Sequence, residues 1–150
     1  MREAAFNLIG PLDDAAALDL FAGSGAMGLE ALSRGASQCV FVDSDRAACA
    51  VIRENLATLA LTGAVVLCED VFQALRKDRA ARRTYNLVIA DPPYGRWTEL
   101  EARLADAVPD LLAPDGLLVI ETQARIEPQL SLDLVTSRRY GSARITLFSR

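Results

Sequence analysis

The chain of 150 residues contains no histidine. Without imidazole, Ser-His and Cys-His nucleophiles are excluded, and any general base must be a carboxylate, an amine or a phenol. Cysteine is also scarce, since Cys39, Cys49 and Cys68 are widely spaced and form no C-x-x-C pair. We therefore expect no metal site, and we interpret the cysteines as small buried thiols in a reducing cytosol. A reaction that needs little base catalysis is favoured.

Long apolar runs are absent as well. No stretch approaches the roughly 18 residues that a membrane span requires. The first residues, MREAAFNLIG, contain an acid and lack a long apolar segment, so they do not form a secretory signal. Repeats, low-complexity tracts and linkers are also missing. The length therefore predicts a single domain in the cytoplasm, with no membrane partner.

Positive charge is in deficit, because 16 Lys and Arg against 20 Asp and Glu give a net charge of −4. That balance alone argues against a polyanionic partner. The deficit lies in residues 1–75, which carry 4 basic and 10 acidic side chains, whereas residues 76–150 carry 12 and 10. Five of the positive charges fall in RKDRAARR (76–83). We interpret this run as a solvated helix end, with a phosphate-contacting patch as the alternative.

Short apolar runs alternate with segments of helical periodicity along most of the chain. Strands are predicted over 15–21, 38–43, 64–70, 85–91 and 117–122, and helices over 26–35, 45–61, 71–78 and 97–112. One face of the helix over 45–61 carries Val51, Ile52, Asn55, Leu56 and Leu59. Two last strand patterns flank Tyr140-Gly141 with no helix between them, so they pair antiparallel. The pattern predicts a doubly wound α/β fold with a mostly parallel sheet and a C-terminal antiparallel hairpin.

A glycine-rich loop follows the first predicted strand. Gly23, Gly25 and Gly28 have the G-x-G-x-x-G order that lets a backbone approach a ligand closely, which dehydrogenases and methyltransferases share. Asp19 shifts the balance between the two. A carboxylate beside the helix N-terminus would repel a pyrophosphate but suits a ligand that carries an ammonium group. The alternative is that Asp19 only accepts hydrogen bonds from loop amides.

Acidic residues end further predicted strands. Asp43 is suited to accept both hydroxyls of an adenosine ribose, and Asp70, after Glu69, to accept from an adenine amino group. In an open parallel sheet the carboxyl ends of the strands line one crevice, so we expect these acids to meet Asp19 and Asp91 there.

The last of these acids opens the sequence Asp91-Pro92-Pro93-Tyr94. The prolines stop the strand, because they donate no ladder hydrogen bond and fix φ. The Asp91 carboxylate and the Pro92 carbonyl can each accept one N–H of a planar amine, which frees the nitrogen lone pair from ring conjugation. Tyr94 can stack on the ring that carries the amine, worth about 1–3 kcal/mol for a base. No histidine is needed, because the nitrogen becomes nucleophilic through hydrogen bonding and loses its proton after alkylation.

Together these motifs resemble class I S-adenosylmethionine-dependent methyltransferases that act on exocyclic amines. More narrowly, REAAFNLIG, LDLFAGSGAMGLEALSRGAS, VFVDSD, NLVIADPPY and RRYGSARITLF are similar to the small-subunit ribosomal RNA methyltransferase D family, over nearly the whole chain. The resemblance implies a seven-stranded Rossmann-like sheet and methyl transfer from S-adenosylmethionine to the N2 amine of a guanine in bacterial 16S rRNA. The implied partner is 16S rRNA within the small ribosomal subunit or its assembly intermediate, and we expect a monomer.

The resemblance also implies roles for individual residues. The cofactor-binding residues are Asp19, Phe21, Ala22, Gly23, Ser24, Gly25, Asp43, Ser44, Asp70 and Val71. The catalytic residues Asp91, Pro92, Pro93 and Tyr94 position guanine for in-line attack on the sulfonium methyl, with S-adenosylhomocysteine as product. The family pattern often has Glu where Asp43 stands, and it includes a basic leader before the REA helix, whereas this chain begins at Met1-Arg2-Glu3. We therefore expect one methyltransferase domain over residues 1–150 without that leader.

Three other interpretations stay open at this point. An amine methyltransferase could act on DNA adenine, which generally needs an added recognition region, or on protein glutamine, which typically goes with Asn in place of Asp91. A non-catalytic module could bind S-adenosylmethionine or only RNA. A nicotinamide dehydrogenase would leave Asp19 and the Asp91–Tyr94 stretch without a role.

Overall fold

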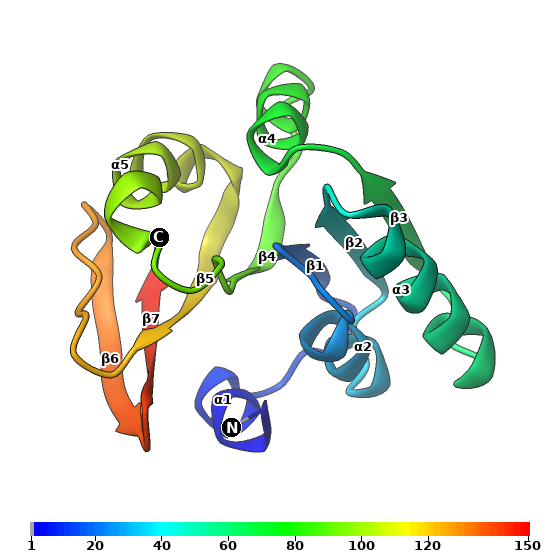
Figure 1. The fold of residues 1–150 in the computed structure, drawn as a ribbon, viewed down its shortest axis with the longest axis horizontal. Helices are drawn as coiled ribbons and strands as arrows, with labels where there is room; N and C mark the ends of the chain where they lie inside the picture. Colours follow the sequence, from blue (N-terminus) through cyan, green and yellow to red (C-terminus); the bar gives the residue numbers. More distant parts are fainter. Residues whose placement is uncertain (1) are drawn as a thin grey trace.

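The computed structural model describes residues 2–150 as five α-helices, a 3-10 helix and seven strands. The helices are α1 (Arg2–Ile9), α2 (Ala26–Ser33), α3 (Arg46–Thr58), α4 (Val71–Ala80), α5 (Trp97–Ala107) and the 3-10 helix η1 (Pro109–Leu111). The strands are β1 (Ala16–Leu20), β2 (Gln38–Asp43), β3 (Ala64–Cys68), β4 (Tyr85–Ala90), β5 (Leu112–Gln123), β6 (Asp133–Tyr140) and β7 (Ala143–Ser149). Helices cover both faces of the sheet (Figure 1).

The seven strands form one sheet in the order β3-β2-β1-β4-β5-β7-β6. The pairs from β3 to β5 are parallel, whereas β7 lies antiparallel to both β5 and β6. The predicted doubly wound sheet with a C-terminal antiparallel hairpin is therefore confirmed. Because β2 and β4 both lie beside β1, the strand order reverses there, and ligands of such sheets bind at this switch point.

Alternating side chains of the buried strands supply two separate cores. Leu18 and Val88 face α4 and α5, whereas Ala17 and Leu87 face α1, α2 and α3. Figure 1 shows α1 and α2 below the strands and α4 above them. Continuous apolar strands are what a sheet covered on both faces requires. No helix within residues 2–150 combines the length and the apolar character needed to cross a membrane.

Two expectations about burial are wrong at the β3 edge of the sheet. In α3 the buried side chains are Cys49 and Ile52, while Val51 is 41% and Leu59 is 55% exposed. The helix covers only β2 and β3, so a narrow stripe of it finds a partner. Cys68 is exposed rather than buried, because β3 has a neighbouring strand on one side only.

The region before the fifth predicted strand also differs from expectation. The predicted strand begins at residue 117, but β5 begins at Leu112, so Pro114-Asp115-Gly116 lies within it. Leu112 already pairs with Tyr85, and the register shifts before Leu117 pairs with Leu87. Pro114, Asp115 and Gly116 thus form an irregularity within one long strand, and Asp115 has a φ of 63°.

Candidate active site

The glycine loop is tied to β1 by a buried carboxylate. Asp19 is 2% exposed, and its Oδ2 accepts a hydrogen bond of 2.9 Å from the Gly28 amide in the first turn of α2. Gly28 packs tightly, because a Cβ there would collide with the Phe41 ring and lie 2.8 Å from Cys39 Sγ. Burial, with the nearby Asp91 and Asp43, raises the pKa of Asp19 to about 8, and the Gly28 hydrogen bond only partly opposes this rise. The Asp19 side chain already takes up one amide of this helix N-terminus, which leaves one donor fewer for a phosphate there.

A second carboxylate fixes the loop from β2. Asp43 Oδ2 accepts from the Gly23 amide at 2.8 Å, and Oδ1 accepts from the Asp45 amide at 2.9 Å. Phe21 at φ 56° and Gly23 at φ 58° both adopt the left-handed conformation, which is costly for Phe. The loop is therefore held in a strained shape by the residues that surround it.

The loop borders a pocket of about 310 Å³, which we call the glycine-loop pocket. Its lining residues are Phe21, Gly23, Asp43, Ser44, Asp70, Val71, Phe72, Asp91, Pro93, Arg96, Leu100 and Arg103. Six of the ten predicted cofactor-binding residues are thus brought together: Phe21, Gly23, Asp43, Ser44, Asp70 and Val71. The other four, Asp19, Ala22, Ser24 and Gly25, lie next to the pocket without lining it. Of the four acids expected to share a crevice, Asp43, Asp70 and Asp91 line this pocket, whereas the buried Asp19 does not.

Asp70 has a structural task besides lining this pocket. It is the N-cap of α4, and its Oδ2 accepts from the amides of Phe72 and Gln73 at 3.0 and 3.1 Å. One oxygen thus satisfies helix amides, while Oδ1 makes no hydrogen bond within residues 2–150. The same side chain both begins the helix and borders the pocket.

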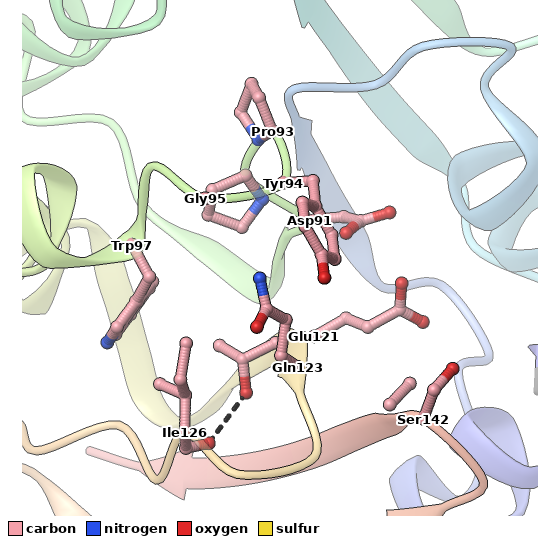
Figure 2. Close-up of a pocket in the computed structure, with 12 residues that line it drawn as sticks. Asp91, Pro93, Tyr94, Gly95, Trp97, Glu121, Gln123, Ile126 and Ser142 are labelled. Carbon is pink, nitrogen blue, oxygen red and sulfur yellow. Dashed lines mark hydrogen bonds between the residues drawn. The ribbon is translucent and has the colours of Figure 1, made fainter.

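A second pocket of about 190 Å³, the tyrosine pocket, lies across Asp91 from the first. Figure 2 shows its lining residues, which are Asp91, Pro92, Pro93, Tyr94, Gly95, Trp97, Glu121, Thr122, Gln123, Ile126, Ser142 and Ala143. All four predicted catalytic residues are among them. Tyr94 is 88% exposed, so its ring is accessible to a planar ligand. Asp91 and Pro93 line both pockets, and they form the wall between them.

Asp91 is not alone in this wall. It follows Ala90 at the end of β4, which pairs with Ile120 of β5, so Glu121 stands beside it on the neighbouring strand. Burial and the adjacent Glu121 carboxyl raise the pKa of Asp91 to about 7. Asp91 therefore changes between its acid and carboxylate forms close to neutral pH.

Sequence reasoning missed three charged residues of the site. Glu121 lies two residues before the end of β5, so the rule that selected acids at strand ends does not reach it. Arg96, the N-cap of α5, and Arg103 within α5 line the glycine-loop pocket, and the Arg103 guanidinium lies 3.7 Å from the centroid of the Phe72 ring. Nothing in the helical pattern indicates that these arginines face a strand end, because that depends on how α5 crosses the sheet.

Comparison with known proteins decides the family. A family model described as "Conserved hypothetical protein 95" matches residues 1–149. "Putative rRNA methyltransferase YlbH" of Bacillus subtilis is 38% identical over 157 residues, which cover 100% of this chain and 84% of that protein. Ribosomal RNA small subunit methyltransferase D of Escherichia coli is 36% identical over 137 residues, which cover 91% of this chain and 65% of that protein. The chain belongs to the family that this model describes. The resemblance to the methyltransferase D proteins is confirmed.

A solved structure agrees with the family assignment. "Putative methyltransferase yhhF" from Escherichia coli superposes with a TM-score of 0.83 at 34% identity, over 99% of this chain and 84% of that chain. The sheet of this family member is thus the seven-stranded class I methyltransferase sheet. The chain spans just under two thirds of the Escherichia coli methyltransferase D protein, at 65% of its length.

The basic run of this family member lies at the end of α4 and is largely paired. Lys77 Nζ lies 2.9 Å from Glu69 Oε2, Arg79 Nη2 lies 2.9 Å from Asp110 Oδ2, and Arg83 pairs with Asp78. This pairing favours the helix-end interpretation over a phosphate-contacting patch. Among residues 2–150, no three His, Cys, Asp or Glu side chains are grouped so that they could hold a metal ion.

Proposed function

We propose that this protein transfers the methyl group of S-adenosylmethionine to the exocyclic N2 amine of a guanine in 16S rRNA. The observation that carries the proposal is the shared wall, since Asp91 and Pro93 line both pockets. A methyl donor in the glycine-loop pocket and an amine in the tyrosine pocket would meet at this wall. Holding two reactants in such a geometry is itself a large part of catalysis.

The residues around the glycine-loop pocket fit S-adenosylmethionine. A Cβ built on Gly23 would meet no heavy atom within 4 Å, so the missing side chain leaves room for a ligand. Asp43 and Asp70 offer carboxylate oxygens to ribose hydroxyls and an adenine amine. Three acids line the pocket, whereas Arg96 pairs with Glu99 and Arg103 stacks on the Phe72 ring, so the lining suits a cationic ligand better than a pyrophosphate. When bound, S-adenosylmethionine supplies a methyl group on a positively charged sulfur, which leaves as a neutral thioether.

The residues of the tyrosine pocket suit a flat ring that carries an amine. In the proposed complex the Asp91 carboxylate and the Pro92 carbonyl each accept one N–H, which turns the nitrogen lone pair toward the glycine-loop pocket. Tyr94 stacks on the ring. As the N–C bond forms, the C–S bond breaks and its electron pair goes to sulfur. The surplus proton passes to Asp91, whose pKa of about 7 makes it a competent acceptor.

The substrate class is supported by the relatives, because YlbH and the Escherichia coli protein are both named as rRNA methyltransferases. The family resemblance supports the guanine N2 position, and the acceptors in the tyrosine pocket are compatible with an exocyclic amine. We further propose that the partner is 16S rRNA in the small subunit or its assembly intermediate, that the enzyme acts as a monomer in the cytoplasm, and that the predicted cofactor and catalytic residues serve these roles.

The test is methyl transfer from labelled S-adenosylmethionine to small subunits that lack the modification, beside naked 16S rRNA, followed by digestion to nucleosides. We expect label in N2-methylguanosine, and we expect Asp91→Ala to abolish it while Asp115→Asn, an exposed change far from both pockets, does not. Label in N6-methyladenosine, or in protein alone, would overturn the guanine assignment. No label with intact cofactor binding would indicate a non-catalytic module.

A further inference from the structure

The tyrosine pocket holds two carboxyl groups, and the proposed amine needs only one of them. Figure 2 shows the Asp91 and Glu121 side chains extending toward the same side of the pocket. Asp91 follows the end of β4 and Glu121 lies beside it in β5, since Ala90 pairs with Ile120. In the proposed reaction Asp91 and the Pro92 carbonyl accept the amine hydrogens, and Glu121 has no assigned role.

Within residues 2–150, no basic side chain neutralises this carboxyl pair. Arg144, whose backbone pairs with the residue next to Glu121, instead bonds to Glu127 at 3.4 Å and donates to the Ala124 carbonyl at 2.9 Å. Arg125 donates to Gln123 at 3.2 Å. Two neighbouring acceptors that the protein itself leaves without a cationic partner suit a ligand edge rich in N–H donors.

The bases differ in what lies beside their exocyclic amine. In guanine the ring nitrogen N1, next to the N2 amine, carries a hydrogen, so the edge presents three N–H donors. In adenine and cytosine the ring nitrogen beside the amine has no hydrogen and is an acceptor. A carboxylate facing that position would bind guanine and repel the other two, and enzymes that take a base into a pocket read this edge.

We propose that Glu121 is the residue that selects guanine, its carboxylate accepting the N1–H while Asp91 and Pro92 accept the two hydrogens of the N2 amine. The proposal rests on the proposed function, because it assumes that the tyrosine pocket receives the target base. It assigns three donors of one base edge to three acceptors, two just after β4 and one in the adjacent β5. Trp97 and Ile126, which line the same pocket, supply apolar surface for the ring.

The test exchanges the single hydrogen that Glu121 is proposed to read. Small subunits are reconstituted with 16S rRNA in which the methylated guanine is kept or replaced by 2-aminopurine, which retains the 2-amine but has no hydrogen on N1. For the wild-type protein we expect kcat/KM for guanine to exceed that for 2-aminopurine by at least about 100-fold, since a site built to accept a hydrogen rejects an analogue that lacks it. In Glu121→Gln the amide can donate to the bare N1, so the ratio falls by about tenfold or more.

The loss of O6 in 2-aminopurine is the same for every variant, so only the change in the ratio reports on residue 121. Glu54→Gln, the same chemical change on an exposed side chain of α3, should leave the ratio at the wild-type value. Glu121→Ala gives an independent check, because it loses rate on guanine and not on 2-aminopurine. A ratio that stays at the wild-type value in both Glu121 variants overturns the inference but not the proposed function. Wild-type protein that labels no guanine overturns both.

Discussion

The Asp19 carboxylate of β1 accepts a hydrogen bond of 2.9 Å from the Gly28 amide of α2. The contact joins the first strand to the first turn of the helix beside the glycine-loop pocket. It also buries an acid that two other acids, Asp91 and Asp43, make harder to ionise. Stability and ligand binding are therefore linked to pH through this side chain.

Asp19→Asn should reduce the dependence of stability on pH. The folded protein holds the Asp19 proton up to a pKa of about 8, whereas the unfolded chain releases it near the ordinary value of 3.8. The unfolded state therefore binds fewer protons between these values, and the free energy of unfolding falls as pH rises from 4 to 8. Asparagine keeps the acceptor for Gly28 and removes the titration. Urea unfolding at pH 5 and pH 8 should show a smaller fall in the variant, by at least about 1 kcal/mol.

The exposed Asp115→Asn serves as the control and should follow the wild-type curve. Wild-type and Asp19→Asn proteins that lose equal stability between pH 5 and pH 8 would show that Asp19 titrates normally.

Gly28→Ala should destabilise the fold by about 1–3 kcal/mol, because the added Cβ overpacks the contact between α2 and β2. Its nearest neighbours would be the Phe41 ring and Cys39 Sγ. Thermal unfolding measures the effect. The added methyl group should cost less stability in a Phe41→Leu background than in the wild-type background, because the smaller side chain leaves room for it. An unchanged melting temperature would mean that the helix shifts freely, contrary to the packing described.

Tyr94→Ala should lower methyl transfer without lowering stability. The side chain is 88% exposed, so its removal costs little packing, while the loss of a stacked base is worth about 1–3 kcal/mol. We expect kcat/KM for small subunits to fall by about 5- to 150-fold, with unfolding unchanged and Tyr94→Phe near wild type. A Phe variant as poor as Ala would assign the role to the hydroxyl instead.

The rate of methyl transfer should rise with pH and level off above about pH 8. The carboxylate form of Asp91 is the one that accepts the amine hydrogen, and its pKa of about 7 places the change in this range. Glu121→Gln removes a neighbouring negative charge, so its profile should shift to lower pH. Single-turnover rates between pH 5.5 and 9 measure both. Identical profiles for the two proteins would separate Glu121 from the titration of Asp91.

Most of the fold could be predicted because each buried strand is a continuous apolar run between helical segments. The predicted strand 38–43 coincides with β2, and the hairpin around Tyr140-Gly141 follows from the lack of a helix between its strands. The exposed Val51 and Cys68 could not be predicted, because their burial depends on which strand is the edge of the sheet. Strand order is a property of the tertiary structure, and periodicity along the chain does not contain it.

Some residues of the site could also be predicted from the sequence, and others could not. The end of a parallel strand is recognisable in sequence, so Asp43 and Asp91 could be placed at one crevice. That Asp70 caps α4 with the oxygen it would otherwise present to a ligand was not foreseen, although a helix was predicted from residue 71. The proximity of Asp91 and Glu121 could not be predicted, because it depends on β5 lying beside β4.

In the proposed reaction Asp91 acts on the amine in the tyrosine pocket and not on the cofactor in the glycine-loop pocket. We would compare wild type with Asp91→Asn in single-turnover methyl transfer to small subunits and in binding of S-adenosylhomocysteine. We predict that the rate falls by at least about 100-fold while the Kd changes by less than about threefold, because the neutral asparagine amide accepts the amine hydrogen more weakly and cannot take up the surplus proton. A variant that transfers methyl groups at the wild-type rate, or that fails only because it no longer binds S-adenosylhomocysteine, would contradict the account.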